Sequence, residues 1–218
     1  MDKKKKKPWP TKNAMQQVYE MKLWGTNNTA FYSGDGSHNL KITKPYLQAV
    51  TSFLISFKNP ISVCDLGCGD FNIGKELVKY TQQYFAVDIV PELIEFNKNK
   101  FVKENLEFSC LDIAKDNLPI ADCVIIRQVL QHLSNKEIQN VVSKLKNYKY
   151  VILTEHLPNG SFIPNKDIIS GQGIRLKKNS GVNLLEAPFN FKVKSDKELF
   201  RINLEDNKGV IVTNLYKI

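Results

Sequence analysis

Short apolar runs alternate with amphipathic stretches through the middle of this 218-residue chain, and this alternation limits the fold more than any other feature. Five runs have the length and composition of buried strands, at 61–66, 84–88, 106–110, 123–127 and 150–154. Three stretches between them have helical spacing of apolar residues, at 73–80, 91–100 and 135–145. Strands that alternate with helices are joined by right-handed crossovers, which predicts a parallel sheet covered on both faces.

Two further apolar runs, at 199–204 and 209–216, predict a closing antiparallel hairpin. We therefore expect an α/β fold, with a doubly wound, mostly parallel seven-stranded sheet and a C-terminal antiparallel hairpin. The main domain is predicted at 45–218, starting with a helix at 45–57 that has Pro45 in its first turn. Residues 1–44 are expected to form a basic tail, a helix and a lid-like loop. The polar segment 157–191 is expected to be an inserted substrate loop, and no helical spacing of apolar residues is evident before the sixth strand.

The composition is that of a soluble globular protein, and no apolar run reaches the ~18 residues of a membrane span. No apolar segment follows the lysines near the N-terminus, as a signal peptide requires, so we expect a cytoplasmic protein without a membrane partner. The four cysteines lie in or beside strand-like runs and are expected to be buried free thiols. The histidines lie too far away for a zinc pattern, so no metal is expected.

The net charge of +9 raises the possibility of a nucleic-acid partner. Lys3 to Lys7 supply five of these charges, which leaves +4 for the rest of the chain. One interpretation is a solvated tail; the other is an arm that binds RNA or another anionic surface.

The first strand-like run ends in a glycine turn, Asp65-Leu-Gly67-Cys-Gly69-Asp70. Glycines allow a tight turn and a close approach of a ligand to the backbone. A dinucleotide fingerprint would have a third glycine where this chain has Asn72. Two carboxylates would also repel a pyrophosphate, whereas the ammonium and sulfonium of S-adenosylmethionine suit them. The turn therefore favours S-adenosylmethionine over NAD.

Carboxylates also follow the second and third strand-like runs. Asp88, at the end of the second, is placed to accept hydrogen bonds from both ribose hydroxyls, or else to cap the helix near Pro91. Asp112 follows the third run and is a candidate for the adenine amino group, with Ile89 and Ile113 packed on the ring.

With these motifs in order, residues 61 to about 156 resemble the cofactor half of class I (Rossmann-like) S-adenosylmethionine-dependent methyltransferases. Asp-Leu-Gly-Cys-Gly is the segment most characteristic of that family. One departure is Phe71, where many members have another glycine. The resemblance implies a cofactor pocket formed by Asp65, Gly67, Gly69, Asp88 and Asp112, with backbone contacts near Arg127 and Gln128. Asp70 and Asn72 of the glycine turn are also expected at the cofactor.

Methyl transfer from a sulfonium is a direct displacement, so the protein mainly positions the acceptor and removes a proton where needed. His132 follows the fourth strand-like run and is the first candidate for a general base, or else a histidine bonded to backbone. His156 and Glu155, at the end of the fifth run, rank second and third.

Selectivity is expected from the segments added to the cofactor half. In one hypothesis, residues 31–38 fold over the cofactor as a lid, with Trp24 and Tyr32 covering the methionine end; in the other, they form a surface loop. Arg175 lies in the later loop and is either a grip for a carboxylate or phosphate of the acceptor, or a solvated residue.

The leading hypothesis is a methyltransferase that acts on oxygen or nitrogen of a small polar acceptor. Residues 127–132 read Arg-Gln-Val-Leu-Gln-His, without the two prolines and aromatic residue common in methylases of exocyclic base nitrogens. The alternatives are an RNA methyltransferase that uses the basic tail and a non-catalytic S-adenosylmethionine-binding module. A nicotinamide oxidoreductase is least favoured, for the charge reasons above.

Overall fold

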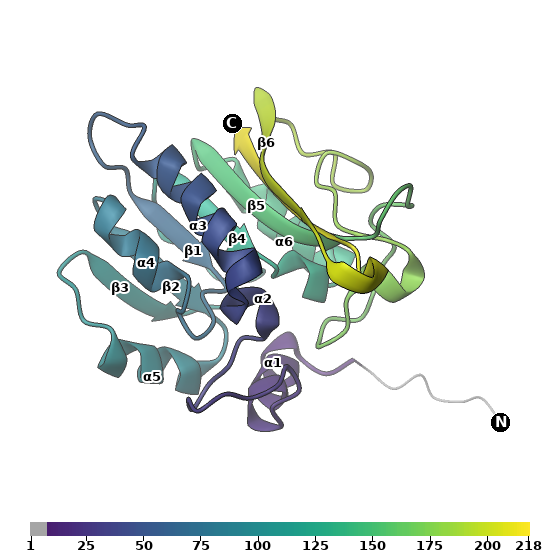
Figure 1. The fold of residues 1–218 in the computed structure, drawn as a ribbon, viewed down its shortest axis with the longest axis horizontal. Helices are drawn as coiled ribbons and strands as arrows, with labels where there is room; N and C mark the ends of the chain where they lie inside the picture. The colour runs from purple at the N-terminus through teal and green to yellow at the C-terminus, as the bar shows by residue number, and fades with distance from the viewer. Residues whose placement is uncertain (1–7) are drawn as a thin grey trace.

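Seven strands form one sheet in the order β3-β2-β1-β4-β5-β7-β6 in this computed structural model, which describes residues 8–218 (Figure 1). All neighbouring strands are parallel except the two pairs that β7 makes with β5 and β6. The predicted α/β class, with a C-terminal antiparallel hairpin, is confirmed. The strands are β1 (Val63–Leu66), β2 (Tyr84–Asp88), β3 (Leu106–Cys110), β4 (Cys123–Arg127), β5 (Tyr150–Leu157), β6 (Ser195–Asn203) and β7 (Val210–Lys217).

Helices cover both faces of the sheet. One face packs against α3, α4 and α5, whereas α6 covers the other together with residues of the loop 182–191. The longer helices are α1 (Thr11–Glu20), α3 (Leu40–Leu54), α5 (Pro91–Lys100) and α6 (Asn135–Leu145), and the short ones are α2 (Asp35–His38) and α4 (Gly74–Leu77). Single 3-10 turns are η1 (Val78–Tyr80), η2 (Leu130–His132), η3 (Arg175–Lys178) and η4 (Glu205–Asn207).

The strands are buried on both faces, which explains their continuous apolar runs. Within β4, Ile125 belongs to the core under α3, and its neighbour Ile126 belongs to the core under α6. The same two-residue period places Val63 and Cys64 of β1 in opposite cores.

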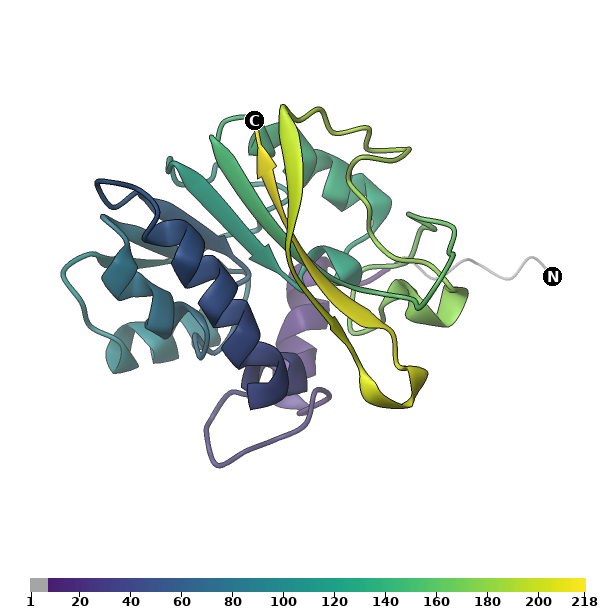
Figure 2. The same cartoon turned by 45° about the horizontal axis from the view of Figure 1, so that its top comes forward.

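The N-terminal segment lies across one end of the sheet instead of on a face (Figures 1 and 2). Met15 of α1 packs in a small apolar cluster with Val90 and Leu93, which follow β2. At the first residue of α1, one turn before Met15, the Thr11 hydroxyl bonds to the Glu137 carboxylate of α6. The helix therefore spans the carboxyl ends of the strands.

The third helix begins earlier than predicted. It starts at Leu40, where the Asn39 side chain accepts a hydrogen bond from the Lys41 amide at 2.9 Å. This cap lets the helix run through Pro45, which lies inside it and not in its first turn. The predicted boundary between residues 44 and 45 therefore falls within a helix.

Several smaller expectations differ from the structure. The segment predicted as a helix at 73–80 is one α turn followed by a 3-10 turn. Between β5 and β6 the chain has no α-helix, as the sequence indicated, and contains η3 alone. The four cysteines are free, but Cys110 is exposed because it ends the edge strand β3.

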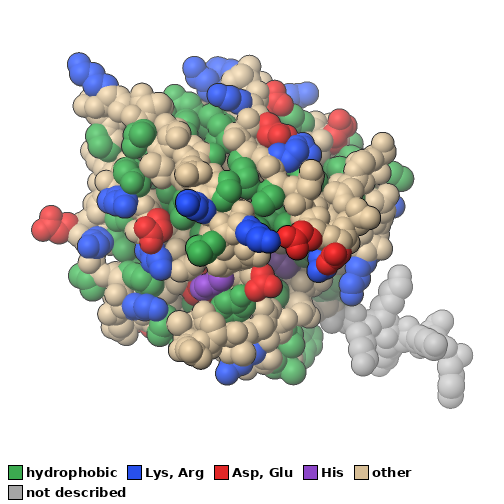
Figure 3. Space-filling view, in the orientation of Figure 1, with side chains coloured by type: hydrophobic (Ala, Val, Ile, Leu, Met, Phe, Trp, Pro, Cys, Tyr) green, Lys and Arg blue, Asp and Glu red, His purple; other side chains and the backbone are tan. Residues whose placement is uncertain are grey.

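Over residues 8–218, no group of histidine, cysteine and carboxylate side chains is arranged to hold a metal, and no helix is both long and apolar enough to cross a membrane. Lysine and arginine side chains are interspersed with acidic ones on the face shown in Figure 3. The lysine run at 3–7 lies outside the described residues.

Candidate functional site

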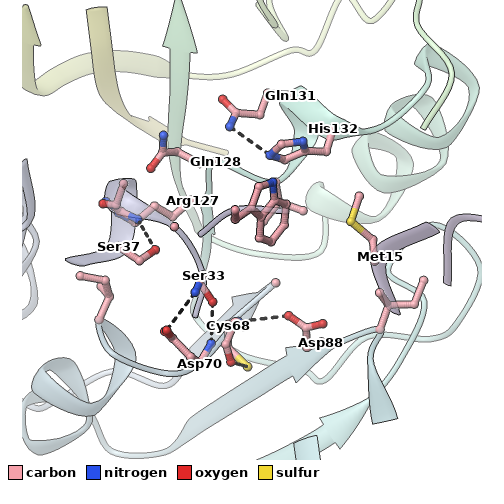
Figure 4. Close-up of a pocket in the computed structure, with 18 of the residues that line it drawn as sticks. Met15, Ser33, Ser37, Cys68, Asp70, Asp88, Arg127, Gln128, Gln131 and His132 are labelled. Atoms are coloured by element: carbon pink, nitrogen blue, oxygen red, sulfur yellow. Dashed lines mark hydrogen bonds between the residues drawn. The ribbon is translucent and has the colours of Figure 1, made fainter. Parts of the chain in front are cut away.

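A cavity of about 540 Å³ lies at the carboxyl ends of β1 to β4, where the strand order reverses between β1 and β4 (Figure 4). Its floor is formed by the turns that follow these four strands. Its roof consists of residues of α1, Trp24 and residues 33–37. A side wall is formed by residues of η2, Leu133, residues 172–174 and Lys177. Ligands of doubly wound sheets bind at this position.

Most residues expected at the cofactor line this cavity, and so do two of the other candidates, His132 and Trp24. Asn72, Tyr32, Glu155, His156 and Arg175 do not line it. The expected cofactor residues that line it are Asp65, Gly67, Gly69, Asp70, Asp88, Ile89, Asp112, Ile113, Arg127 and Gln128.

The glycine turn requires its glycines. Gly67 has φ of 82° and Gly69 has φ of 56°, a region that other residues rarely adopt. A Cβ at Gly67 would overlap the Val129 side chain, and a Cβ at Gly69 would overlap the Ser33 hydroxyl of the roof. Phe71 also has a positive φ, 60°, and its buried ring packs on neighbouring aromatic rings.

Asp88 is held by backbone amides at the end of β2. Its two carboxylate oxygens accept from the amides of Gly69 at 3.0 Å and Val90 at 3.1 Å. A carboxylate has about four acceptor sites, so each oxygen keeps capacity for a further donor. Burial raises the pKa of Asp88, whereas the two amide bonds oppose that shift. The arrangement offers fixed acceptors to a pair of hydroxyls.

Asp65 lies deeper, at the end of β1. One carboxylate oxygen accepts from the Tyr84 hydroxyl at 2.8 Å, and burial raises the pKa of Asp65 to about 7. A positive charge brought into the cavity would favour its ionised form.

Arg127, at the end of β4, carries a cationic side chain in the cavity. The guanidinium donates to the Ser37 hydroxyl at 3.2 Å and to the Gly36 carbonyl, and it lies over the Tyr46 ring, 4.8 Å from the centroid. Its Nε is buried without a hydrogen-bond partner, and burial lowers the pKa of Arg127. An anionic ligand group would satisfy this donor.

Asp112 and its neighbours form the far end of the floor. The Asp112 carboxylate accepts from the Ala114 amide at 3.0 Å and pairs with Lys115 at 2.7 Å. The side chains of Ile89 and Ile113 line the cavity beside it. This end combines an apolar surface with one acidic group.

Residues 31–38, which we call the strap, are tied to the floor by polar contacts (Figure 4). The Ser33 amide donates to the Asp70 carboxylate at 3.0 Å, and the Asp70 amide donates to the Ser33 hydroxyl at 2.8 Å. His38 Nε2 lies 2.5 Å from the same carboxylate. The Asn72 side chain donates to the Ser37 carbonyl at 2.7 Å, so Asn72 holds the strap and does not line the cavity.

Tyr32 does not line the cavity, so it does not cover the cofactor site as the lid hypothesis expected. Its hydroxyl donates to Asp35 at 2.6 Å, and its ring packs on His38 with centroids 4.4 Å apart. Trp24 lines the cavity, and its ring lies 5.2 Å from that of His132.

His132 has hydrogen-bond partners at both ring nitrogens. Its Nδ1 lies 3.2 Å from the Gly171 carbonyl, and its Nε2 lies 3.2 Å from Nε2 of Gln131 (Figure 4). The Gln131 oxygen accepts from the His156 amide at 3.2 Å, which turns the Gln131 amino group toward His132. His132 is therefore the Nδ1–H tautomer, and burial lowers its pKa to about 4.

The two candidates at the end of β5 lie outside the cavity. Both oxygens of Glu155 are buried without a hydrogen-bond partner, and burial raises the pKa of Glu155 to about 8. His156 donates from Nε2 to the Lys208 carbonyl at 2.7 Å, in the loop before β7.

Arg175 is almost fully buried, and most of its hydrogen bonds go to backbone carbonyls of the protein. Its guanidinium donates to the Leu133 carbonyl at 2.7 Å and to the Asn135 side chain at 2.8 Å. Further bonds reach the carbonyls of Leu130, Gln131 and Lys166. Arg175 thus fixes η2, the turn that carries His132, and it is neither solvated nor placed to grip an acceptor.

Sequence reasoning missed most of the roof and the side wall. Met15 and Tyr19 line the cavity because α1 lies across the strand ends, and Ser33 and Ser37 do so through the strap. The helical spacing predicts that α1 exists but not where it packs. The side wall also contains Lys177, which carried no local signal.

A family described as a methyltransferase domain matches residues 63–148. The chain is also 31% identical over 81 residues to malonyl-[acyl-carrier protein] O-methyltransferase of Acetivibrio thermocellus. That match spans 36% of this chain and 29% of the relative, so the chain covers under a third of its length.

Solved structures share the whole fold at low identity. N-methyltransferase NodS from Bradyrhizobium japonicum, solved with S-adenosyl-L-homocysteine, has a TM-score of 0.62 and 11% identity, covering 94% of this chain and 98% of its own. Magnesium protoporphyrin IX methyltransferase (ChlM) from Synechocystis, solved with S-adenosylmethionine, has a TM-score of 0.60 and 15% identity, covering 98% of this chain and 100% of its own.

Proposed function

We propose that this chain transfers a methyl group from S-adenosylmethionine to oxygen or nitrogen of a small polar acceptor. Its residues 63–148 match a methyltransferase domain, and its fold is that of solved methyltransferases. The observation that carries this proposal is Asp88, held at the glycine turn by the Gly69 amide and facing the cavity. A diol such as a ribose matches its remaining acceptor sites.

The charges of the cavity support the choice of cofactor. Asp65, Asp70 and Asp88 line the floor, where they would oppose a pyrophosphate and favour a ligand with an ammonium and a sulfonium. Arg127 is the cation on this side, and its unpartnered Nε suits the carboxylate of the methionine part. Ile89 and Ile113 offer an apolar slot for the adenine ring.

When bound, S-adenosylmethionine supplies a methyl group already activated for displacement, so the protein's task is to position the acceptor and exclude water. Trp24 and the strap cover the cavity and supply that exclusion. His132, bonded at both nitrogens, orients the side wall instead of acting as a free base.

The names of similar proteins support methyl transfer to oxygen or nitrogen and do not fix the acceptor. The curated relative is named an O-methyltransferase, and the two similar structures are an N-methyltransferase and a magnesium protoporphyrin IX methyltransferase.

Methyl-labelled S-adenosylmethionine tests this function directly. The full chain is incubated with the small-molecule fraction of a cell extract or with total RNA, and label transfer is measured. We expect transfer to the small-molecule fraction. Transfer to RNA alone would overturn the acceptor class, and bound cofactor without any transfer would support a non-catalytic module.

A further inference from the structure

The acidic side chains that line the cavity are confined to one part of its surface. Every carboxylate that lines it lies on the floor or the strap: Asp35, Asp65, Asp70, Asp88 and Asp112. The side wall and the part of the roof that faces it contain no carboxylate within the described residues. They are joined as one surface, because His132 contacts Trp24 and the Gln172 side chain donates to the Leu23 carbonyl at 3.0 Å.

This second surface combines apolar side chains with uncharged polar ones, among them Gln131 and Gln172, and one cation. Met15, Trp24, Leu133 and Ile174 supply its apolar area, and Lys177 supplies its charge. Since the floor accounts for the cofactor in the proposed function, this surface is the place for the acceptor. An acceptor that fits has an apolar body and a negatively charged group.

The same surface has no free proton acceptor among its described residues. His132 donates from Nδ1 to Gly171, and its Nε2 lone pair faces the Gln131 amino group. The Thr11 hydroxyl bonds to Glu137, outside the lining. Glu155 lies behind η2 and does not reach the cavity. An alcohol, a phenol or an ammonium must lose a proton to become nucleophilic, and nothing here is placed to take it.

We propose, on the basis of the proposed function, that the acceptor is a carboxylate on an apolar body, oriented by Lys177 and methylated to an ester. A carboxylic acid with a pKa near ~4 is already ionised at neutral pH. Its oxygen lone pair forms the new bond to the methyl carbon while the bond from that carbon to sulfur breaks. The bonding pair stays on sulfur, which becomes a neutral thioether, and no proton moves.

A matched series of phenylpropyl compounds tests the acceptor class by binding. The full chain is first saturated with S-adenosylhomocysteine in a calorimeter, and then titrated with 3-phenylpropionate, 3-phenylpropylamine or 3-phenylpropanol. We expect 3-phenylpropionate to bind at least ~10-fold more tightly than either analogue. Equal or tighter binding of the amine or the alcohol, or no binding of the acid, overturns the proposal.

Lys177→Gln separates a charge contact from general apolar binding. The variant should weaken 3-phenylpropionate about 10-fold and leave 3-phenylpropanol unchanged. Lys178→Gln is the matched control, because its ammonium bonds to the Asp167 carbonyl and does not line the cavity. Equal effects of the two substitutions on 3-phenylpropionate overturn the role of Lys177.

The titration with S-adenosylhomocysteine also distinguishes a failure of the proposed function from a failure of the acceptor proposal. If S-adenosylhomocysteine does not bind, the proposed function fails, and the acceptor proposal fails with it. If it binds but 3-phenylpropylamine is preferred, only the acceptor proposal fails. With labelled S-adenosylmethionine, an ester product is recognised because base releases its methyl group as methanol.

Discussion

The floor and the roof of the cavity are built in different ways. The floor consists of turns attached to strands that are buried on both faces, and Asp88 is fixed there by two backbone amides. The roof has one small apolar cluster around Met15, aromatic contacts such as the one between Phe31 and Phe96, and polar contacts such as the one between Ser33 and Asp70. Structure held mainly by such contacts opens at lower free energy than a buried core does. The roof can therefore open while the floor stays folded.

The largest effect is expected from a substitution in the floor. Gly67→Ala places a side chain at φ of 82° and against Val129, so the turn must move. We expect affinity for S-adenosylmethionine to fall about 100-fold, or roughly 2.7 kcal/mol, by calorimetry.

Gly160→Ala is the control for backbone strain. Gly160 has φ of 68°, but nothing lies within 4 Å of an added Cβ. Its variant should bind S-adenosylmethionine normally. A similar loss in both variants would mean that the effect is general instability and not the shape of the floor.

The second prediction concerns the buried carboxylate at the end of β5. The pKa of Glu155 is raised to about 8 by burial, so the folded state binds its proton more tightly than the unfolded state does. The free energy of unfolding should therefore fall as pH rises from ~4.5 to ~8. Glu155→Gln removes this loss and should be more stable at pH 8, by on the order of 2 kcal/mol, with little difference below pH 4.5.

Denaturant unfolding at several pH values measures this effect. Glu107→Gln, at an exposed position of β3, is the control and should leave the pH dependence unchanged. A Glu155→Gln variant that shows the wild-type pH dependence would contradict a neutral, buried Glu155.

The third prediction tests whether the strap can open while the strands of the floor stay folded. Asp70→Ala removes the carboxylate that accepts from Ser33 and contacts His38. We expect about 10-fold weaker binding of S-adenosylmethionine. Hydrogen exchange should accelerate at residues 31–38 but not in β1 or β4. Acceleration throughout the sheet would show that the roof and the floor unfold together.

The smallest effect is expected at Tyr32, which belongs to the strap but does not line the cavity. Tyr32→Phe removes only the hydrogen bond to Asp35, so cofactor affinity and turnover should change less than about 2-fold. Trp24→Ala, by contrast, should reduce turnover, because Trp24 lines the cavity. A large effect of Tyr32→Phe would mean that the strap closes differently from this structure.

The sequence predicted the floor because its signals are local. The apolar runs mark the strands, the strand ends mark one edge of the sheet, and Gly67 and Gly69 lie where the turn needs a positive φ. The sequence did not predict which side chains at the end of β5 enter the cavity. Glu155 and His156 lie at the expected edge of the sheet but do not line the cavity.

The roof and the side wall depend on contacts between distant segments, which leave no period in the sequence. Ser33 and Asp70 are 37 residues apart. Arg175 was a candidate for the acceptor because it lies in a glycine-rich loop, yet its partners are backbone carbonyls such as that of Leu133, 42 residues earlier. Backbone carbonyls exist in every residue, so no residue type identifies such a contact.

Calorimetric titration of the full chain with S-adenosylmethionine, repeated on Asp88→Ala, tests the central claim most directly. We predict clear binding to the native protein and at least ~10-fold weaker binding to the variant, about 1.4 kcal/mol. Asp196→Ala, on the exposed strand β6, should bind like the native protein. Equal affinity of the native protein and Asp88→Ala, or binding of NAD in place of S-adenosylmethionine, would contradict the account.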